Sequence, residues 1–395
     1  MPERRLQMKK KEEKRVKIFG FVKADQITLK EASSRLDISY RQTLRLYAAY
    51  KENGNEGLIH GNCGKIPKNQ LSEEFKEKVL EIYREYYYDF GPTFAAEKLS
   101  ESHDIHISVS SLRKLLIKAK LWENKQQRIK IHRSRRARRE HFGELIQFDG
   151  SHHNWFGEIR CCLITMIDDA TNIRISRFFE EETIAGAMTV FYLWIKSKGI
   201  PEALYCDKKN AFVLTREPTD AELLAGITEP KSHFGNACEK LGVYVISANS
   251  PQAKGRVERN HRIDQDRLVK ELRLAGITDI DAANRFLEDI YLPKMNEKFS
   301  LPPAKKEDAH VPLGDVDLSE ILCYEYDRKI GNDYVVRFEN RLFQILKSNN
   351  ILPRTRDKVV VRVKLDGTVS IIWKDKKLFV KEIINTKYDK PERVA

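Results

Sequence analysis

The sequence predicts a multidomain protein with all-α helix-turn-helix domains at the N-terminus, an α/β core with a mixed sheet, and a small β-barrel at the C-terminus. Three observations lead to this prediction. Apolar residues recur at helical spacing as far as Ala119, and from Glu144 strand-like runs alternate with helices. Beyond about Asp317 the chain consists of short β-branched runs separated by turn residues.

These changes of pattern divide the chain, which at 395 residues is too long for one ordinary domain. The predicted segments are a helix-turn-helix domain at 1–66, a second one at 67–123, a basic linker at 124–143, the α/β core at 144–316 and the β-barrel at 317–395.

Composition limits the class of protein. With 41% hydrophobic and 33% charged residues the chain can bury real cores. It has no apolar run long enough to span a membrane, and the first fifteen residues, MPERRLQMKKKEEKR, lack the apolar stretch of a secretory signal. The six cysteines show no C-x-x-C pair and no companion histidines at zinc-ligand spacing. We therefore expect reduced thiols that act as core residues, and a cytoplasmic protein.

The net charge of +13 and the pI near 9.2 predict a polyanionic partner. Basic residues are concentrated in the linker, where a solvated spacer is the alternative to phosphate contact. We expect contact with DNA phosphates from Arg133, Arg135, Arg136, Arg138 and Arg139.

In the first domain, Thr28 and Glu31 form a predicted capping box for a helix that ends at Asp37. A second helix, 40–52, follows a tight turn. We expect it to turn Leu44, Tyr47 and Ala48 inward. Its outer residues Arg41, Gln42 and Arg45 would then be available to DNA, as in a helix-turn-helix, although a plain helical hairpin is the alternative.

A similar pattern recurs in the second domain. Ser72 begins an amphipathic helix, Pro92 opens another, and Ser108 or Ser110 starts a third. Leu112 and Leu116 would face inward on the third helix, and Arg113 and Lys114 would face outward towards DNA.

The core should contain strands at 144–149, 160–168, 173–179, 203–206 and 244–247, with helices at 183–198, 234–241 and 252–275. A further helix is expected at 281–299. Beyond 317, short strands at 335–338, 342–346, 358–363, 369–373 and 378–380 fit a small barrel.

Three acidic residues stand out in the core: Asp149, Asp207 and Glu258. Two of them follow predicted strands, and ends of neighbouring strands are where sites assemble in α/β sheets. The third lies on a helix with a cationic stripe. Each could instead be structural, as a cap, a turn residue or an i,i+4 partner of Arg262. Together they could hold two Mg²⁺ ions beside a phosphodiester. Basic neighbours that could contact phosphate are Lys208, Lys254, Arg256, Arg259 and Arg262.

The neighbourhoods of these acids, FGELIQFDGSHHNWF, CCLITMIDDATNIRISRFFEEET and NSPQAKGRVERNHR, resemble DDE-type transposases and retroviral-type integrases, whose core is RNase H-like. The closest resemblance is to insertion-sequence transposases of the ISNCY type. The RRARRE run and the paired helix-turn-helix front share this resemblance, which covers nearly the whole chain.

The resemblance implies that Asp149, Asp207 and Glu258 are both the catalytic residues and the ligands of two Mg²⁺ ions, with Mn²⁺ as a possible substitute. It also implies binding to terminal inverted repeats and target DNA, strand cleavage and joining, and a homodimer or higher oligomer on DNA in a bacterial, nucleoid-associated setting. One departure is the spacing of 51 positions between Asp207 and Glu258, which suggests an insertion at 214–231.

Other residues are weaker candidates. We expect Asp168 and Asp169 to be structural turn residues, His152 and His153 to be exposed, and Trp155 to be buried. Two other functions also remain: a non-catalytic, transposase-derived DNA-binding regulator, and a nuclease that hydrolyses DNA without joining it.

Overall fold

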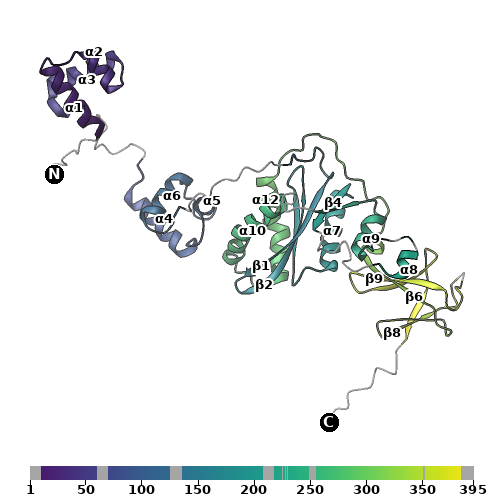
Figure 1. The fold of residues 1–395 in the computed structure, drawn as a ribbon. Helices are drawn as coiled ribbons and strands as arrows, with labels where there is room; N and C mark the ends of the chain where they lie inside the picture. The colour runs from purple at the N-terminus through teal and green to yellow at the C-terminus, as the bar shows by residue number, and fades with distance from the viewer. Residues whose placement is uncertain are drawn as a thin grey trace, which may run out of the picture. The chain divides into compact units, whose positions relative to one another are not determined.

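The computed structural model describes residues 10–59, 70–124, 136–207, 218–224, 226, 228, 230–248, 255–349 and 352–383. The chain forms two compact units, Met1–Trp122 and Glu123–Ala395 (Figure 1). No helix in the described ranges is both long and apolar enough to cross a membrane.

The first unit begins with the helices α1 (Lys10–Lys23), α2 (Leu29–Leu36) and α3 (Tyr40–Asn53), followed by a 3-10 turn at Gly54–Leu58. The predicted capping box at the start of α2 is confirmed, because Thr28 accepts from the backbone of Glu31 and the Glu31 carboxylate accepts from Thr28. Asp37 ends α2 in the left-handed conformation. A short turn therefore leads directly into α3, whose N-cap is Ser39.

The inward face of α3 differs from the prediction. Tyr47 is buried as expected, but Leu44 and Ala48 are exposed, and Thr43 is buried instead. The aromatic ring of Phe19 on α1 selects this face, since it packs against Tyr47 and Tyr50 at centroid separations of 5.5 and 5.9 Å.

A separate helical cluster contains α4 (Glu73–Tyr86), α5 (Pro92–His103) and α6 (Val109–Lys118), which enclose their own apolar core. Ser72 caps α4, where a helix was predicted to begin, and of the two residues considered for the start of α6 it is Ser108 that caps it. Leu112 and Leu116 are buried, which confirms the expected inner face of α6.

The second unit contains a five-stranded sheet in the order β3-β2-β1-β4-β5. Its strands are β1 (Ile146–Phe156), β2 (Ile159–Asp168), β3 (Arg174–Phe179), β4 (Ala203–Asp207) and β5 (Tyr244–Ala248). The pairs β1–β2 and β2–β3 are antiparallel, and β1–β4 and β4–β5 are parallel. The predicted mixed sheet is therefore confirmed.

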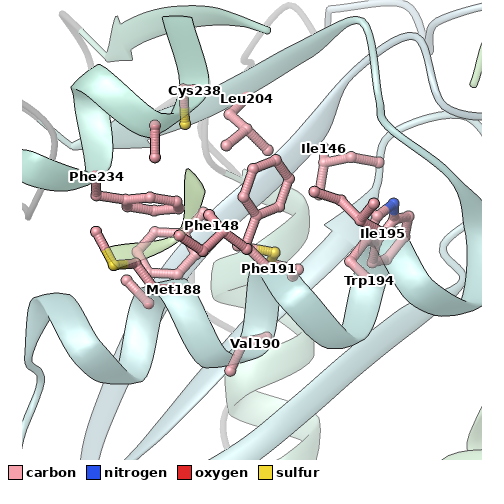
Figure 2. Close-up of a cluster of buried hydrophobic side chains, with 14 of the residues drawn as sticks. Ile146, Phe148, Met188, Val190, Phe191, Trp194, Ile195, Leu204, Phe234 and Cys238 are labelled. Carbon is pink, nitrogen blue, oxygen red and sulfur yellow. The ribbon is translucent and has the colours of Figure 1, made fainter. Parts of the chain in front are cut away.

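Helices cover both faces of this sheet (Figure 1). On one face, α7 (Ile184–Lys198) and α9 (His233–Lys240) enclose a core in which Phe148, Phe191 and Phe234 pack together (Figure 2). In the first half of β1, before the register shift between Asn154 and Phe156, even-numbered residues point to this face, because Ile146 and Phe148 belong to the same core. A short helix, α8 (Asp220–Leu224), precedes α9 in the chain.

The other face is covered by α10 (Gly255–Leu274) and by a helical segment at the place of the helix predicted at 281–299, which is confirmed apart from a π-helical turn. That segment consists of α11 (Ile280–Phe286), a π-helical turn at Leu287–Tyr291 and α12 (Leu292–Phe299). Trp155, Leu268 and Tyr291 are central to the second core that forms here. Odd-numbered residues near the start of β1 point to this α10 face.

The C-terminal part begins with α13 (Leu318–Ile321) and β6 (Cys323–Lys329), a strand that the sequence pattern did not predict. The later strands are β7 (Val335–Phe338), β8 (Arg341–Ile345), β9 (Lys358–Lys364), β10 (Val369–Trp373), β11 (Lys376–Lys377) and β12 (Val380–Ile383).

The predicted small β-barrel is not confirmed, because the described strands do not form a closed barrel. The strands form two antiparallel sheets, β11-β10-β9-β6 and β12-β8-β7, which share one apolar core. β10 pairs with the two-residue β11, and the next strand, β12, pairs with β8 of the other sheet. Lys240 of α9 binds Glu325 of β6 at 2.5 Å and so ties the first of these sheets to the core.

Candidate active site

Asp149 lies in the middle of a strand, not at a strand end as predicted. It is the fourth residue of the eleven-residue β1 and pairs with Thr165 of β2. Only the β4 side of β1 ends here, because the β1–β4 ladder consists of Ile146 with Leu204 and Gln147 with Tyr205. What ends just before Asp149 is therefore the pairing of β1 with β4, not β1 itself. Asp149 remains paired with β2 on its other side.

The same register brings the second acid close in the backbone. The ladder pairs Ile146 with Leu204 and Gln147 with Tyr205, so positions 149 and 207 each lie two residues beyond its last pair. Asp207 is the last residue of β4 and pairs with Ala248 of β5. Its side chain is outside the part of the chain that the structure describes.

Helix α10 runs along β1 in the same direction. Three contacts in succession show this: the Val257 amide donates to Gln147 Oε1 at 3.2 Å, His261 Nδ1 lies 3.5 Å from Asp149 Oδ2, and Gln265 Nε2 donates to Ser151 Oγ at 3.0 Å. Two strand residues advance for every four helix residues, as their rises per residue require.

Helical geometry gives the side of α10 on which Glu258 lies. Asn260 and Asp264 face β3, because both accept hydrogen bonds from Arg174 at its start. With 3.6 residues per turn, residue 258 lies on the opposite flank of the helix. That flank is nearer to β4, and Glu258 is exposed there one turn before His261. The backbone at positions 149, 207 and 258 therefore lies in one region, near the end of the β1–β4 ladder and the start of α10.

His261 is a candidate site residue that we did not predict. Its side chain is only 8% exposed, and the Asp149 side chain that it contacts is 22% exposed. Within the described residues its Nε2 atom is buried and has no hydrogen-bond partner. The one signal that could have identified it is its position three residues after Glu258 on the same helix.

Asp168 and Asp169 are structural, as predicted. The Asp168 carboxylate accepts from the Thr171 amide and hydroxyl and from the Gly143 amide. Burial raises the pKa of Asp168, and these three donors act in the opposite direction. Asp169 is fully buried and binds the guanidinium groups of Arg136, at 2.5 Å, and Arg256.

Several arginines predicted to contact DNA have partners within the protein. Arg138 donates to the backbone carbonyls of residues 169 and 170, and Arg139 binds Glu144 at 3.2 Å. Burial lowers the pKa of Arg256, and the Asp169 carboxylate opposes that change. Arg136, Arg138, Arg139 and Arg256 thus help to hold the core together.

The other predicted DNA contacts fall into two groups. The first group is exposed: Arg41, Gln42, Arg45, Arg113, Lys114, Arg259 and Arg262. The second group lies outside the described residues: Arg133, Arg135, Lys208 and Lys254. Of the weaker candidates, His152 is exposed and His153 partly exposed, and Trp155 is buried as expected.

Comparison with known proteins adds independent information. No family model matches the chain. The protein named "Putative transposase y4bF" from Sinorhizobium fredii is 33% identical over 393 residues, which cover 98% of this chain and 83% of that protein. The chain belongs to the insertion-sequence transposases. A second transposase, that of insertion sequence IS1202 from Streptococcus pneumoniae, is 29% identical over 91% of this chain and 83% of its own length.

Solved structures similar to this transposase include retroviral integrases. The catalytic core domain of HTLV-2 integrase in complex with magnesium is 19% identical and covers 37% of this chain and 82% of its own, with a TM-score of 0.27. The integrase assembly of simian T-cell lymphotropic virus is 13% identical and covers 78% of this chain and 99% of its own, with a TM-score of 0.34. At these scores, family membership rests on the sequence relatives alone.

Proposed function

We propose that the chain is a DNA transposase that binds the terminal inverted repeats of its element, cleaves phosphodiester bonds there and joins the ends to target DNA. The observation that carries the proposal is the convergence of the backbone at positions 149, 207 and 258 near the end of the β1–β4 ladder and the start of α10. Membership of a transposase family over 98% of the chain supports it.

In this proposal Asp149, Asp207 and Glu258 hold divalent metal ions. The fit is chemical: Asp149 is partly exposed, Glu258 is exposed, and carboxylate oxygens are the donors that Mg²⁺ and Mn²⁺ prefer. Two bound Mg²⁺ ions would supply Lewis-acid activation of the attacking oxygen and stabilisation of the leaving one. The protein residues fix the geometry, since β1 and α10 are joined at three successive points along their length.

DNA binding is assigned to exposed basic residues. On α3, Arg41, Gln42 and Arg45 project from a helix that follows a tight turn, as a recognition helix requires. Arg259 and Arg262 are exposed on α10 and adjoin Glu258, so they could contact phosphates of the reacting strand. Joining two element ends requires two active sites, and the active form is therefore a homodimer or a larger oligomer on DNA.

The test is a joining assay with pre-cut duplexes of the element end, supercoiled target plasmid and Mg²⁺. Wild-type protein should give a covalently joined product. Asp149→Asn and Glu258→Gln should each lower the joining rate more than about a hundredfold, because loss of one group that stabilises the transition state has an effect of that size. Affinity for the end duplex should be unchanged in both variants.

Asp266→Asn is the matched control, because this acid lies on the same helix, is 60% exposed and pairs only with Lys270 in the described residues. It should join DNA at the wild-type rate. Cleavage without joined product would indicate the nuclease function. DNA binding without any cleavage by the wild-type protein, in Mg²⁺ or in Mn²⁺, would overturn the proposal and favour the non-catalytic regulator.

A further inference from the structure

A second group of metal-ligating side chains lies away from the carboxylates. His152 on β1 is directly opposite Cys162 on β2. Glu182 comes from the connection between β3 and α7, one residue before the α7 N-cap Thr183. One ligand atom from each of these three side chains lies within 4.8 Å of the other two. Three separate elements thus converge on one point.

This cluster is on the other face of the sheet from Asp149. Cys162 belongs to the core beneath α7, and His152 has the same parity along β1 as Phe148 of that core. Asp149 instead points to α10, where it meets His261. The cluster is therefore distinct from the proposed catalytic carboxylates, although its strand is the same.

A glycine makes room for the cluster. A Cβ atom at position 150, between Phe148 and His152 on the same face, would lie 2.7 Å from the Glu182 carboxyl carbon and 3.0 Å from Cys162 Sγ. Both separations are too short for ordinary contacts. The absence of a side chain at Gly150 therefore lets the carboxylate and the thiol approach each other above the strand.

The environments of the three groups suit an ion with one open side. Cys162 is fully buried and is a free cysteine, whereas His152 is exposed, so the point where they meet lies at the edge of the core. Burial, together with the Glu182 carboxylate, raises the pKa of the Cys162 thiol to about 12.

We propose that His152, Cys162 and Glu182 form a binding site for a Zn²⁺-type transition-metal ion. A thiolate, an imidazole and a carboxylate with a fourth position open to water are a ligand set that such ions prefer, and Mg²⁺ does not. On binding, the metal–sulfur bond replaces the S–H bond of Cys162, and the proton leaves to solvent. The ion joins β1, β2 and the start of α7.

The test uses the full-length protein, Co²⁺ as the spectroscopic probe and Mg²⁺ in large excess to occupy oxygen-only sites. One equivalent of Co²⁺ should produce a thiolate-to-cobalt charge-transfer band, and Zn²⁺ should abolish it by displacement. Cys162→Ser should remove the band. His152→Ala and Glu182→Gln should each weaken binding at least about tenfold, the scale reported for loss of groups around metal sites.

Cys161→Ser is the matched control. Cys161 is the adjacent buried cysteine and belongs to the core on the α10 face, so its loss should leave the band intact. Asp149→Asn should also retain the band. Far-UV circular dichroism of each variant shows whether it is folded, and Glu182→Gln keeps the test valid if Cys162→Ser does not fold.

The proposal is overturned if folded wild-type protein shows no thiolate band, or if the band survives in Cys162→Ser. It is also overturned if His152→Ala and Glu182→Gln both bind Co²⁺ as the wild type does. These measurements do not depend on DNA joining. The metal-site proposal can therefore be wrong while the proposed function is right, and the proposed function can be wrong while the metal site exists.

Discussion

At the residue scale, the contact between His261 and Asp149 restrains one of the proposed metal ligands. His261 is a buried residue of α10, and its Nδ1 atom lies 3.5 Å from the Asp149 carboxylate. A group that orients a metal ligand changes metal affinity without contacting the metal itself. His261 is therefore a positioning residue in the proposed mechanism.

We expect His261→Ala to raise the Mg²⁺ concentration for half-maximal joining about tenfold, because Asp149 loses a restraint on its orientation. Titration of the joining rate with Mg²⁺ measures this. Gln265→Ala, one turn further along α10, removes a contact with Ser151 rather than with a carboxylate, and should leave the Mg²⁺ requirement unchanged. An equal shift in both variants would mean that the effect comes from α10 as a whole.

Asp169 provides a prediction on stability. It is fully buried and compensates two arginines, so Asp169→Ala leaves two guanidinium groups without their partner. Breaking a buried ion pair in this way costs about 3–5 kcal/mol. Calorimetry should show the thermal midpoint of the second unit lowered by roughly 6–15 °C. Asp266→Ala, which breaks an exposed pair with Lys270, should change it little.

At the element scale, α10 is held to the sheet by a buried cluster as well as by β1. Arg174 at the start of β3 binds Asp264 at 3.0 Å, and the Tyr291 hydroxyl donates to Asp264 at 2.8 Å. Tyr291 lies in the π-helical turn between α11 and α12, so one carboxylate connects three elements. Glu258 depends on this cluster for its position, since it lies on the same helix.

Two substitutions should separate the contributions in this cluster. Tyr291→Phe removes one hydrogen bond to a charged group and should cost about 1.5–3 kcal/mol. Arg174→Met leaves Asp264 buried without its cation and should cost about 3–5 kcal/mol. Thermal unfolding of the two variants ranks them, and a larger loss for Tyr291→Phe would show that the ion pair is not the main attachment.

The exposed face of α3 gives a prediction on DNA binding. If Arg41 and Arg45 contact phosphates, the double variant Arg41→Ala/Arg45→Ala should reduce the slope of log affinity against log salt by roughly two. Fluorescence anisotropy with an element-end duplex measures the slope. An unrelated duplex should show the same reduction, because phosphate contacts carry no sequence information. A loss confined to the element end would indicate base contacts instead.

At the scale of the whole molecule, buried thiols predict how stability depends on pH. Burial raises the pKa values of Cys161 and Cys323 to about 11, against an unfolded value of roughly 8.5. Between these values the unfolded chain loses protons that the folded chain keeps, so stability falls as pH rises from about 8.5 to 11. In Cys161→Ser the slope of stability against pH should be smaller by the contribution of one titrating proton. Thermal midpoints measured across that pH range would show this. An unchanged slope would contradict it.

Much of the fold could be predicted because its signals are local. The caps at Thr28, Ser72 and Ser108 and the apolar spacing of α6 and α7 depend on residues a few positions apart. Whether the C-terminal strands close into a barrel could not be predicted, because closure depends on which strands pair across long stretches of sequence. The predicted inner face of α3 was right at Tyr47 but wrong at Leu44 and Ala48 for the same reason, since the buried face packs against Phe19 of another helix.

The candidate site was predictable in its acidic members but not in their surroundings. Asp149 was expected at a strand end because it follows an apolar run, whereas β1 continues to Phe156. Gly150, the next residue, makes room for Glu182 and Cys162. The only local signal of His261 is its position three residues after Glu258, and the pairing of Asp169 with Arg136 and Arg256 has no local signal. The contact of His261 with Asp149 and the ion pairs of Asp169 all join residues at least 33 positions apart in the sequence.

The shared anchor at Asp169 has a mechanical consequence. Arg136 belongs to the segment that enters the core from the basic linker, and Arg256 is the second residue of α10, two positions before Glu258. Because both cations bind the same buried carboxylate, a displacement of Arg136 would disturb the ion pair that holds the first turn of α10. A change in the segment that precedes the core would therefore act on the helix that carries Glu258.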